Sequence, residues 1–198
     1  MNGKTEDRRI RKTKQALKNS LAALLEKKDI RDISVQELAS HADLNRTTFY
    51  LHYKDIYDLQ QQIENEAAGK INAILEEYVP LKGHEQIYLM LTKFLTCIKE
   101  DVDLHHIILG KNKNQVFLRE ICRSLETHCV KAWTEAFNIH GQEEQLDYFG
   151  GYIIQGYMAV VVKWVEFGMK ESPEQMAKMM GDMGLYGLRF LEDKAAEN

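Results

Sequence analysis

Three helix start signals lie close together in the first third of the chain, and they constrain the fold more than any other feature. Ser34 and Glu37 form an S-x-x-E capping box, and Asn45 and Asp55 are short polar residues that can accept free backbone N–H groups. Apolar residues at helical spacing follow each signal. The segment 34–59 is therefore predicted to hold two short helices, joined by a tight turn, and the start of a third.

Apolar residues recur at helical spacing along nearly the whole chain, which contains only two prolines. We therefore expect an all-α fold. The predicted helices cover residues 5–27, 34–41, 45–53, 56–78, 84–100, 102–109, 113–138, 142–169 and 172–193. No flexible linker interrupts the fourth helix, so we place the domain boundary inside it. Residues 1–65 would form an N-terminal three-helix domain with its motif at 34–53, and residues 66–198 a larger helical domain.

Composition argues for a globular protein inside the cell. Hydrophobic residues make up 44% of the chain and charged residues 28%. The longest apolar run, 158–162, is far short of the ~20 residues that cross a bilayer, and the charged N-terminus resembles no secretion signal. Cys97, Cys122 and Cys129 are then expected to be reduced thiols, and the protein to be cytoplasmic.

The net charge of −4 hides an uneven distribution. Residues 1–60 contain 12 Lys and Arg against 9 Asp and Glu, whereas the rest of the chain contains 14 against 21. A basic N-terminal part on an acidic body would orient the molecule near a polyanion such as DNA. Taken alone, the basic run is better explained as a solvated helix face, and it is the adjoining capped helices that favour DNA.

The spacing of the motif is typical of a helix-turn-helix, whose second helix enters the major groove of DNA. Arg46, in the first turn of that helix, can bond guanine through two N–H groups. Free amides at the starts of the neighbouring helices can bind phosphate. The candidate DNA-binding residues are Ser34, Gln36, Asn45, Arg46, Thr47, Thr48, Tyr50, His52 and Lys54. The alternative is an exposed polar face without a role in DNA binding.

The run LNRTTFYLHYKD at residues 44–55 resembles the TetR/AcrR family of bacterial transcriptional regulators, which carry T-x-Y-x-H/Y-F and then a capped helix. The resemblance covers about residues 8–66, and the segment from Gly150 to Pro173 is similar to TetR-type C-terminal domains of Firmicutes regulators. It implies a sequence-specific DNA-binding regulator, more often a repressor than an activator. It also implies phosphate contacts from Tyr50 and His52.

Two residues depart from the family pattern. Asp43 stands in the turn where the family usually has Gly, and Asp adopts the left-handed backbone at some strain. Ile56 stands where the family usually has a Lys that holds a phosphate. Lys54, two residues earlier, is the candidate to replace that contact. Without such a replacement, the affinity for DNA should be lower than is usual for the family.

The resemblance further implies a homodimer formed by the last two helices of each subunit. Two such subunits place their recognition helices on a pseudo-palindromic operator, roughly 34–36 Å or a multiple apart. The candidate interface residues are Gly151, Met176, Met179, Met180, Met183 and Gly187. A methionine stripe is also compatible with packing inside one subunit.

Family members usually bind a small-molecule effector in the C-terminal domain. The candidate pocket residues here are Tyr88, Phe94, Phe117, Trp133, Tyr152 and Tyr157, although such residues are more often plain core than pocket lining. His105, His106, Cys122, His128 and Cys129 match no metal-ligand spacing, and no catalytic motif is present, so we expect neither metal, cofactor nor enzymatic activity. Two alternatives remain: a regulator that works through a protein partner without a ligand, and a helical protein that does not bind DNA.

Overall fold

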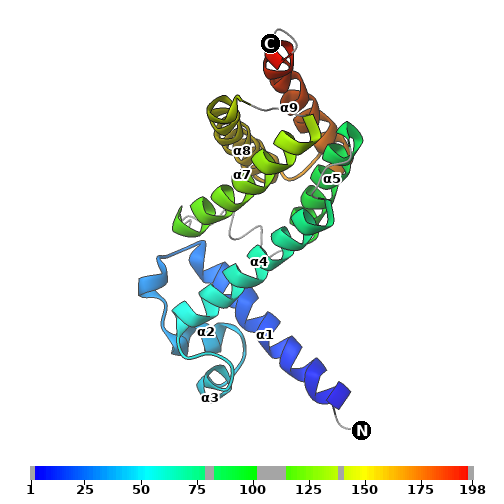
Figure 1. The fold of residues 1–198 in the computed structure, drawn as a ribbon. Helices are drawn as coiled ribbons and strands as arrows, with labels where there is room; N and C mark the ends of the chain where they lie inside the picture. Colours follow the sequence, from blue (N-terminus) through cyan, green and yellow to red (C-terminus); the bar gives the residue numbers. More distant parts are fainter. Residues whose placement is uncertain (1–2, 79–82, 102–114, 138–140, 196–198) are drawn as a thin grey trace. The chain divides into compact units, whose positions relative to one another are not determined.

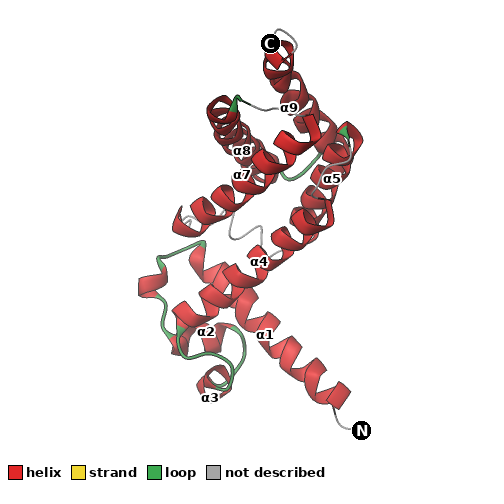
Figure 2. Cartoon of the chain, viewed as in Figure 1, coloured by secondary structure: helices red, strands yellow, loops and turns green. Residues whose placement is uncertain are grey.

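The computed structural model describes residues 3–78, 83–101, 115–137 and 141–195 of the 198-residue chain. Within these ranges every regular element is a helix (Figures 1 and 2), so the predicted all-α fold is confirmed. The helix predicted at 102–109 lies outside the described residues. Contacts divide the chain into two compact units, with the division between Ala67 and Ala68 inside α4 (Ile56–Tyr78).

The first unit contains four short or medium elements and the beginning of α4. These elements are α1 (Gly3–Leu25), the 3-10 helix η1 (Ile30–Asp32), α2 (Val35–His41) and α3 (Arg46–Tyr50). Helix α2 packs against both α1 and α3. The succession of α2, turn and α3 is the helix-turn-helix arrangement that the sequence predicts.

Side-chain caps start the helices of this unit at the predicted positions. The Ser34 hydroxyl accepts the N–H of Glu37 at 3.2 Å, and the Asn45 side chain accepts the N–H of Thr47 at 2.9 Å. A carboxylate oxygen of Asp55 accepts the N–H three residues further along the chain at 2.8 Å. Each bond satisfies an amide that has no partner inside its own helix.

Helix α3 ends at Tyr50, three residues earlier than predicted. Its last turn tightens because the carbonyl of Phe49 accepts two N–H groups, from His52 at 2.9 Å and from Tyr53 at 3.0 Å. The chain then leaves the helix toward α4. The predicted helix of residues 45–53 is therefore a five-residue helix followed by a turn.

Asp43 occupies the left-handed backbone region in the turn before α3, with φ of 55°. Two backbone bonds hold the turn, from Asp43 N–H to the Ser40 carbonyl at 3.2 Å and from Leu44 N–H to the Ala39 carbonyl at 2.9 Å. Aspartate is among the few non-glycine residues that visit this region routinely. The turn therefore keeps its shape without the glycine usual in the family.

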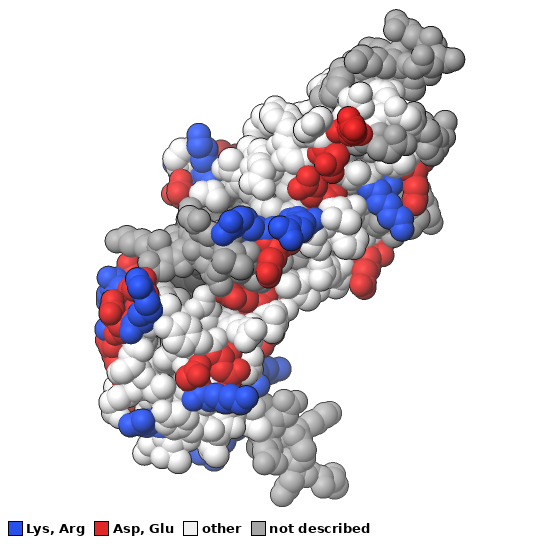
Figure 3. Space-filling view, turned by 60° about the vertical axis from the view of Figure 1, so that its left-hand side comes forward, with Lys and Arg blue, Asp and Glu red and all other residues white. Residues whose placement is uncertain are grey.

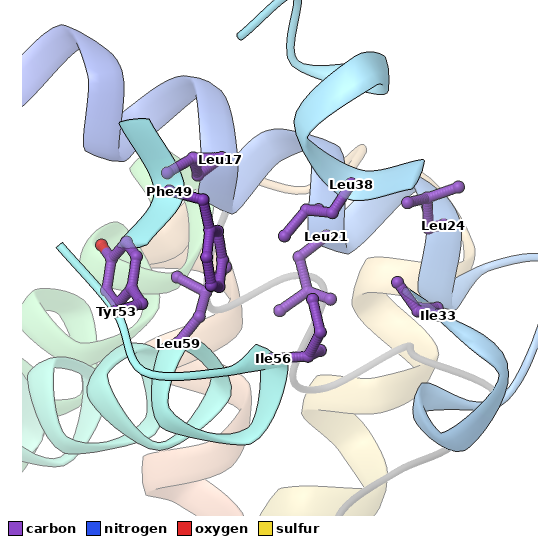
Figure 4. Close-up of a cluster of buried hydrophobic side chains, with 9 residues drawn as sticks. All are labelled: Leu17, Leu21, Leu24, Ile33, Leu38, Phe49, Tyr53, Ile56 and Leu59. Carbon is purple, nitrogen blue, oxygen red and sulfur yellow. The ribbon is translucent and has the colours of Figure 1, made fainter. Parts of the chain in front are cut away.

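One hydrophobic cluster holds the first unit together (Figure 4). Its members come from α1, α2, α3, α4 and the connections between them: Leu17, Leu21, Leu24, Ile33, Leu38, Phe49, Tyr53, Ile56 and Leu59. Phe49 is completely buried and brings the short α3 into the cluster. At the edge of this unit, the ammonium of Lys18 on α1 bonds the carboxylate of Glu66 on α4.

The second unit consists of the end of α4 and four further helices in the described residues. These are α5 (His84–Glu100), α7 (Gln115–Phe137), α8 (Glu143–Glu166) and α9 (Pro173–Ala195). Helix α5 packs along α9, α7 along α8, and α8 also contacts α9. A capping box starts α9, because Ser172 and Gln175 exchange two hydrogen bonds of 2.9 and 3.3 Å.

Two glycines allow close helix packing in this unit. A Cβ atom on Gly181 of α9 would lie 2.6 Å from the Tyr88 ring of α5, and one on Gly150 of α8 would lie 2.5 Å from Val130 of α7. Neither distance is compatible with a side chain at the glycine. These close approaches fix the helices of one subunit against each other.

The core position of Phe49 generates a stability prediction. We expect Phe49→Ala to lower the free energy of unfolding of the first unit by about 3–5 kcal/mol, because it leaves a cavity in the centre of the cluster. Leu51→Ala is the matched control, since Leu51 is 75% exposed two residues away, and we expect a change below about 0.5 kcal/mol. Chemical denaturation followed by circular dichroism measures both, and equal losses would contradict the assigned core.

Candidate nucleic-acid interface

Helix α3 presents a polar surface opposite its buried side. Asn45, Arg46, Thr47 and Tyr50 are exposed and Thr48 is half-buried, whereas Phe49 points into the core. The structure thus brings five of the predicted DNA-binding residues together on one short helix and its cap. The side-chain oxygen of Asn45 also caps the helix, because it accepts the N–H of Thr47.

Arg46 and Tyr50 contact each other across one turn of α3. A terminal guanidinium nitrogen of Arg46 donates to the Tyr50 hydroxyl at 3.1 Å. The guanidinium carbon also lies 5.4 Å from the centroid of the Tyr50 ring, within cation–π range. The guanidinium of Arg46 is therefore held over the Tyr50 ring in the free protein.

The predicted contacts on α2 lie at its exposed start. The Ser34 hydroxyl accepts the capping bond, and its own hydrogen remains able to reach a phosphate oxygen. Gln36 is exposed, and its amide nitrogen donates weakly to the Ser40 hydroxyl at 3.4 Å. Both side chains are compatible with phosphate binding at the N-terminus of a helix.

The start of α4 differs from the expected phosphate site. Ile56, at the position of the usual family lysine, is 5% exposed and belongs to the core. The carboxylate of Asp58 accepts the backbone N–H of Lys54 at 2.8 Å, and this bond holds the pKa of Asp58 below its ordinary value. The backbone N–H groups of Lys54 and Asp58 are therefore already engaged at this helix start. A contribution of Lys54 has to come from its exposed ammonium group.

Helix α1, in the same unit as α3, carries several basic residues. Arg8, Arg9, Arg11 and Lys12 are exposed, and the Lys14 ammonium lies 5.8 Å from the ring centroid of Tyr53, close to the end of α3. Figure 3 shows basic and acidic side chains interspersed over the face that it presents. The attraction for DNA would therefore depend on the local positions of a few cations.

Two exposed apolar residues beside α3 were not among the residues singled out from the sequence. Leu51 is 75% exposed and Tyr57, in the first turn of α4, is 56% exposed. The spacing of Leu51 and Tyr57 along the sequence is compatible with buried and with exposed positions, so the apolar periodicity does not predict that they are exposed. His52 is half-buried, with its ring 6.3 Å from the Tyr53 ring.

A separate apolar cavity of about 60 Å³ lies inside the second unit, lined by α4, α5, α7, α8 and α9. Of the predicted pocket residues, Phe94, Trp133 and Tyr157 line it. Tyr88 instead donates a hydrogen bond of 2.7 Å to Asp182, and Tyr152 is 72% exposed, so neither lies in the lining. The Phe117 side chain lies outside the described part of the chain.

The described cavity lining presents no charge. Its polar groups include the Cys129 thiol and the Tyr157 hydroxyl, and the latter donates to the Met180 carbonyl at 2.5 Å. Burial raises the pKa of Cys129 to about 12 and also raises the pKa of Tyr157, so both groups are neutral at physiological pH. Aliphatic side chains, including Ile71, Ile74 and Leu75 of α4, contribute much of the remaining surface.

The predicted methionine stripe of α9 divides between the core and the surface. Met176 and Met180 are buried within the subunit, whereas Met179 and Met183 are exposed. Tyr148 and Tyr152 on α8, and Tyr186 on α9, are further large exposed side chains. Gly151 lies against Glu126 of its own chain. The surroundings of Gly187 lie outside the described residues.

No three His, Cys, Asp or Glu side chains gather as a metal site in the described ranges. No described helix is long and apolar enough to cross a bilayer.

Comparison with solved structures identifies the fold. The chain is similar to the fatty acid degradation regulator FadR from Bacillus halodurans, with a TM-score of 0.68 and 14% identity over 89% of this chain and 96% of that chain. It is also similar to NalD, the secondary repressor of the MexAB-OprM multidrug efflux pump in Pseudomonas aeruginosa, with a TM-score of 0.64, 14% identity, and 89% and 96% coverage.

A further structural relative is FadR from Bacillus subtilis in complex with stearoyl-CoA, with a TM-score of 0.63 and 16% identity over 86% of this chain and 96% of that chain. A sequence search of curated proteins found no significant match. Residues 85–184, about half of the chain, match the TetR-type family model described as the transcriptional regulator C-terminal region. The chain therefore belongs to the TetR family of transcriptional regulators.

Proposed function

We propose that this protein is a sequence-specific regulator of transcription that binds double-stranded DNA as a homodimer in the cytoplasm. We further propose that it is a repressor released from DNA by a small-molecule effector. The observation that carries DNA binding is the exposed polar face of α3, held rigidly by the Asn45 cap and the buried Phe49.

In this proposal α3 is the recognition helix. The Arg46 guanidinium enters the major groove and donates to guanine O6 and N7, while Thr47 and Thr48 contact neighbouring bases or phosphates. Ser34, Gln36, His52 and Lys54 would bind phosphates and fix the register of the helix. One module of this size contacts few base pairs, so specific binding requires two copies on a pseudo-palindromic site.

The exposed side chains of α8 and α9 support pairing through these helices. Tyr148 and Tyr152 on α8 and Met183 and Tyr186 on α9 are each more than half exposed in the single chain. Aromatic residues and methionine are enriched in protein interfaces. A two-fold arrangement would bury the same surface on both subunits.

The cavity supports control by an apolar, uncharged effector rather than by a protein partner alone. Its volume of about 60 Å³ is well below the roughly 150 Å³ that admits benzene in an engineered protein cavity. An effector would therefore have to expand it. Because Ile71 and Ile74 of α4 form part of the wall, expansion would displace the helix whose beginning packs beside α3. The expanded state would bind the effector and the compact state would bind DNA.

Selection from random DNA duplexes at two salt concentrations tests the central proposal. Enrichment of an inverted repeat would support a dimeric, sequence-specific regulator. Weak binding without enrichment, abolished at the higher salt, would reject it in favour of a partner-dependent protein or one that does not bind DNA.

Arg46→Ala should relax the base preference at one position of each half-site. The expected loss is about 1–3 kcal/mol of discrimination, the value of one good two-pronged contact. Binding to the selected operator and to single-base variants measures the loss. An unchanged preference profile would refute base recognition by Arg46.

Lys54→Ala should weaken binding to all sequences alike. The substitution removes one phosphate-neutralising cation from each subunit of the dimer, so it should reduce the slope of log K against log salt by about 1.8, at about 0.9 for each phosphate. Titrations over a salt series measure the slope. If neither the affinity nor the slope changes, Lys54 does not replace the missing lysine at Ile56.

Met183→Glu should dissociate the proposed dimer, because it places a charge in the middle of the exposed apolar part of α9. Light scattering after size exclusion should show the mass falling to that of one 23.0-kDa chain. Ala73→Glu, at an exposed position of α4, is the control and should leave the mass unchanged. A dimeric Met183→Glu protein would exclude this surface from the interface.

A further inference from the structure

The contact between Arg46 and Tyr50 indicates a function for Tyr50 other than phosphate binding. We propose that Tyr50 is a positioning residue for base recognition, which fixes the plane of the Arg46 guanidinium in the orientation that binds a guanine. The inference rests on the proposed function, since it concerns how the same surface distinguishes one base from another.

The pair is anchored to the core through a chain of aromatic contacts. Phe49 is completely buried, and its ring meets the Tyr50 ring at 5.5 Å between centroids with an angle of 87°, an edge-to-face contact. The Tyr50 ring in turn lies under the guanidinium of Arg46. The position of an exposed, flexible side chain is thus linked to a fully buried ring of the first unit.

The contact leaves the guanidinium free to bind a base. Arg46 has five N–H donors, and the bond to the Tyr50 hydroxyl at 3.1 Å engages one terminal nitrogen. Two of the remaining N–H groups suffice for guanine O6 and N7. The ring contact, together with this hydrogen bond, restrains the guanidinium that carries these two donors.

Holding the side chain in the free protein lowers the entropic cost of forming the base contact. A mobile arginine would have to lose its rotamer freedom on binding, whereas this one is already restrained. A guanidinium whose two N–H donors are held in one orientation also binds more weakly to a base pair that lacks two acceptors in that plane. Tyr50 would therefore increase discrimination at the base pair bound by Arg46, and leave binding to other sequences nearly unchanged.

A phosphate contact makes a different prediction. In the present geometry the Tyr50 oxygen accepts from Arg46, so its own hydrogen can still reach a phosphate. Removing that phosphate bond would weaken binding to every sequence by the same factor, because phosphates carry no sequence information. The two roles can therefore be separated by comparing operators.

The test is a double-mutant cycle on two DNA duplexes. One is the selected operator, and the other has the Arg46-dependent base pair replaced in both half-sites. We expect Tyr50→Phe to reduce the affinity ratio between them by about 3- to 10-fold, and Tyr50→Leu, which also removes the ring, to reduce it further. In the Arg46→Ala background neither change should alter the ratio.

Tyr57→Phe is the matched control, because it removes the same hydroxyl from an exposed tyrosine outside the pair. It should leave the affinity ratio unchanged, and an equal effect would overturn the proposal. A loss that is the same on both duplexes and persists in the Arg46→Ala background would also overturn it, while leaving DNA recognition by α3 intact. If the wild-type protein prefers no DNA sequence, both this inference and the proposed function fail.

Discussion

The burial of Phe49 is the interaction on which the recognition surface depends. A helix of five residues is not stable in water, because too few hydrogen bonds offset the cost of nucleation. Phe49 supplies the missing stability by placing a completely buried ring in the core, and the Asn45 cap fixes the first turn. The polar side chains of α3 therefore project from a rigid support although the helix itself is short.

Helix α4 imposes the second constraint. Ile56 and Leu59 near its start belong to the core of the first unit, whereas Ile71 and Ile74 line the cavity of the second. The ion pair between Glu66 and Lys18 attaches the middle of the helix to α1. A change in the cavity that moves the helix must therefore be accommodated by contacts of the first unit. In the proposed function, this shared helix would be the route by which an effector is coupled to DNA binding.

The features that could be predicted from the sequence are those that depend on residues only a few positions apart along the chain. The caps at Ser34, Asn45 and Ser172 involve partners two or three positions away, so the pattern alone located the helix starts. The division of the methionine stripe could not be predicted in the same way, because Met180 and Met183 differ only in what the rest of the fold places against them. The aliphatic part of the cavity wall could not be predicted for the same reason, because aliphatic residues at helical spacing are found in pocket linings and in cores alike.

The charge distribution explains why the orientation of Arg46 matters in this chain. Ile56 stands where the family usually has a cation at the start of α4, and the Asp58 carboxylate places a negative charge in the same turn. Both features would weaken the sequence-independent attraction to phosphate unless Lys54 supplies the missing contact. A regulator with less of that attraction must obtain more of its operator affinity from base contacts. In our proposal, the contact with Tyr50 holds the Arg46 guanidinium in place, and such a restrained guanidinium would contribute more to a base contact than a mobile cation would.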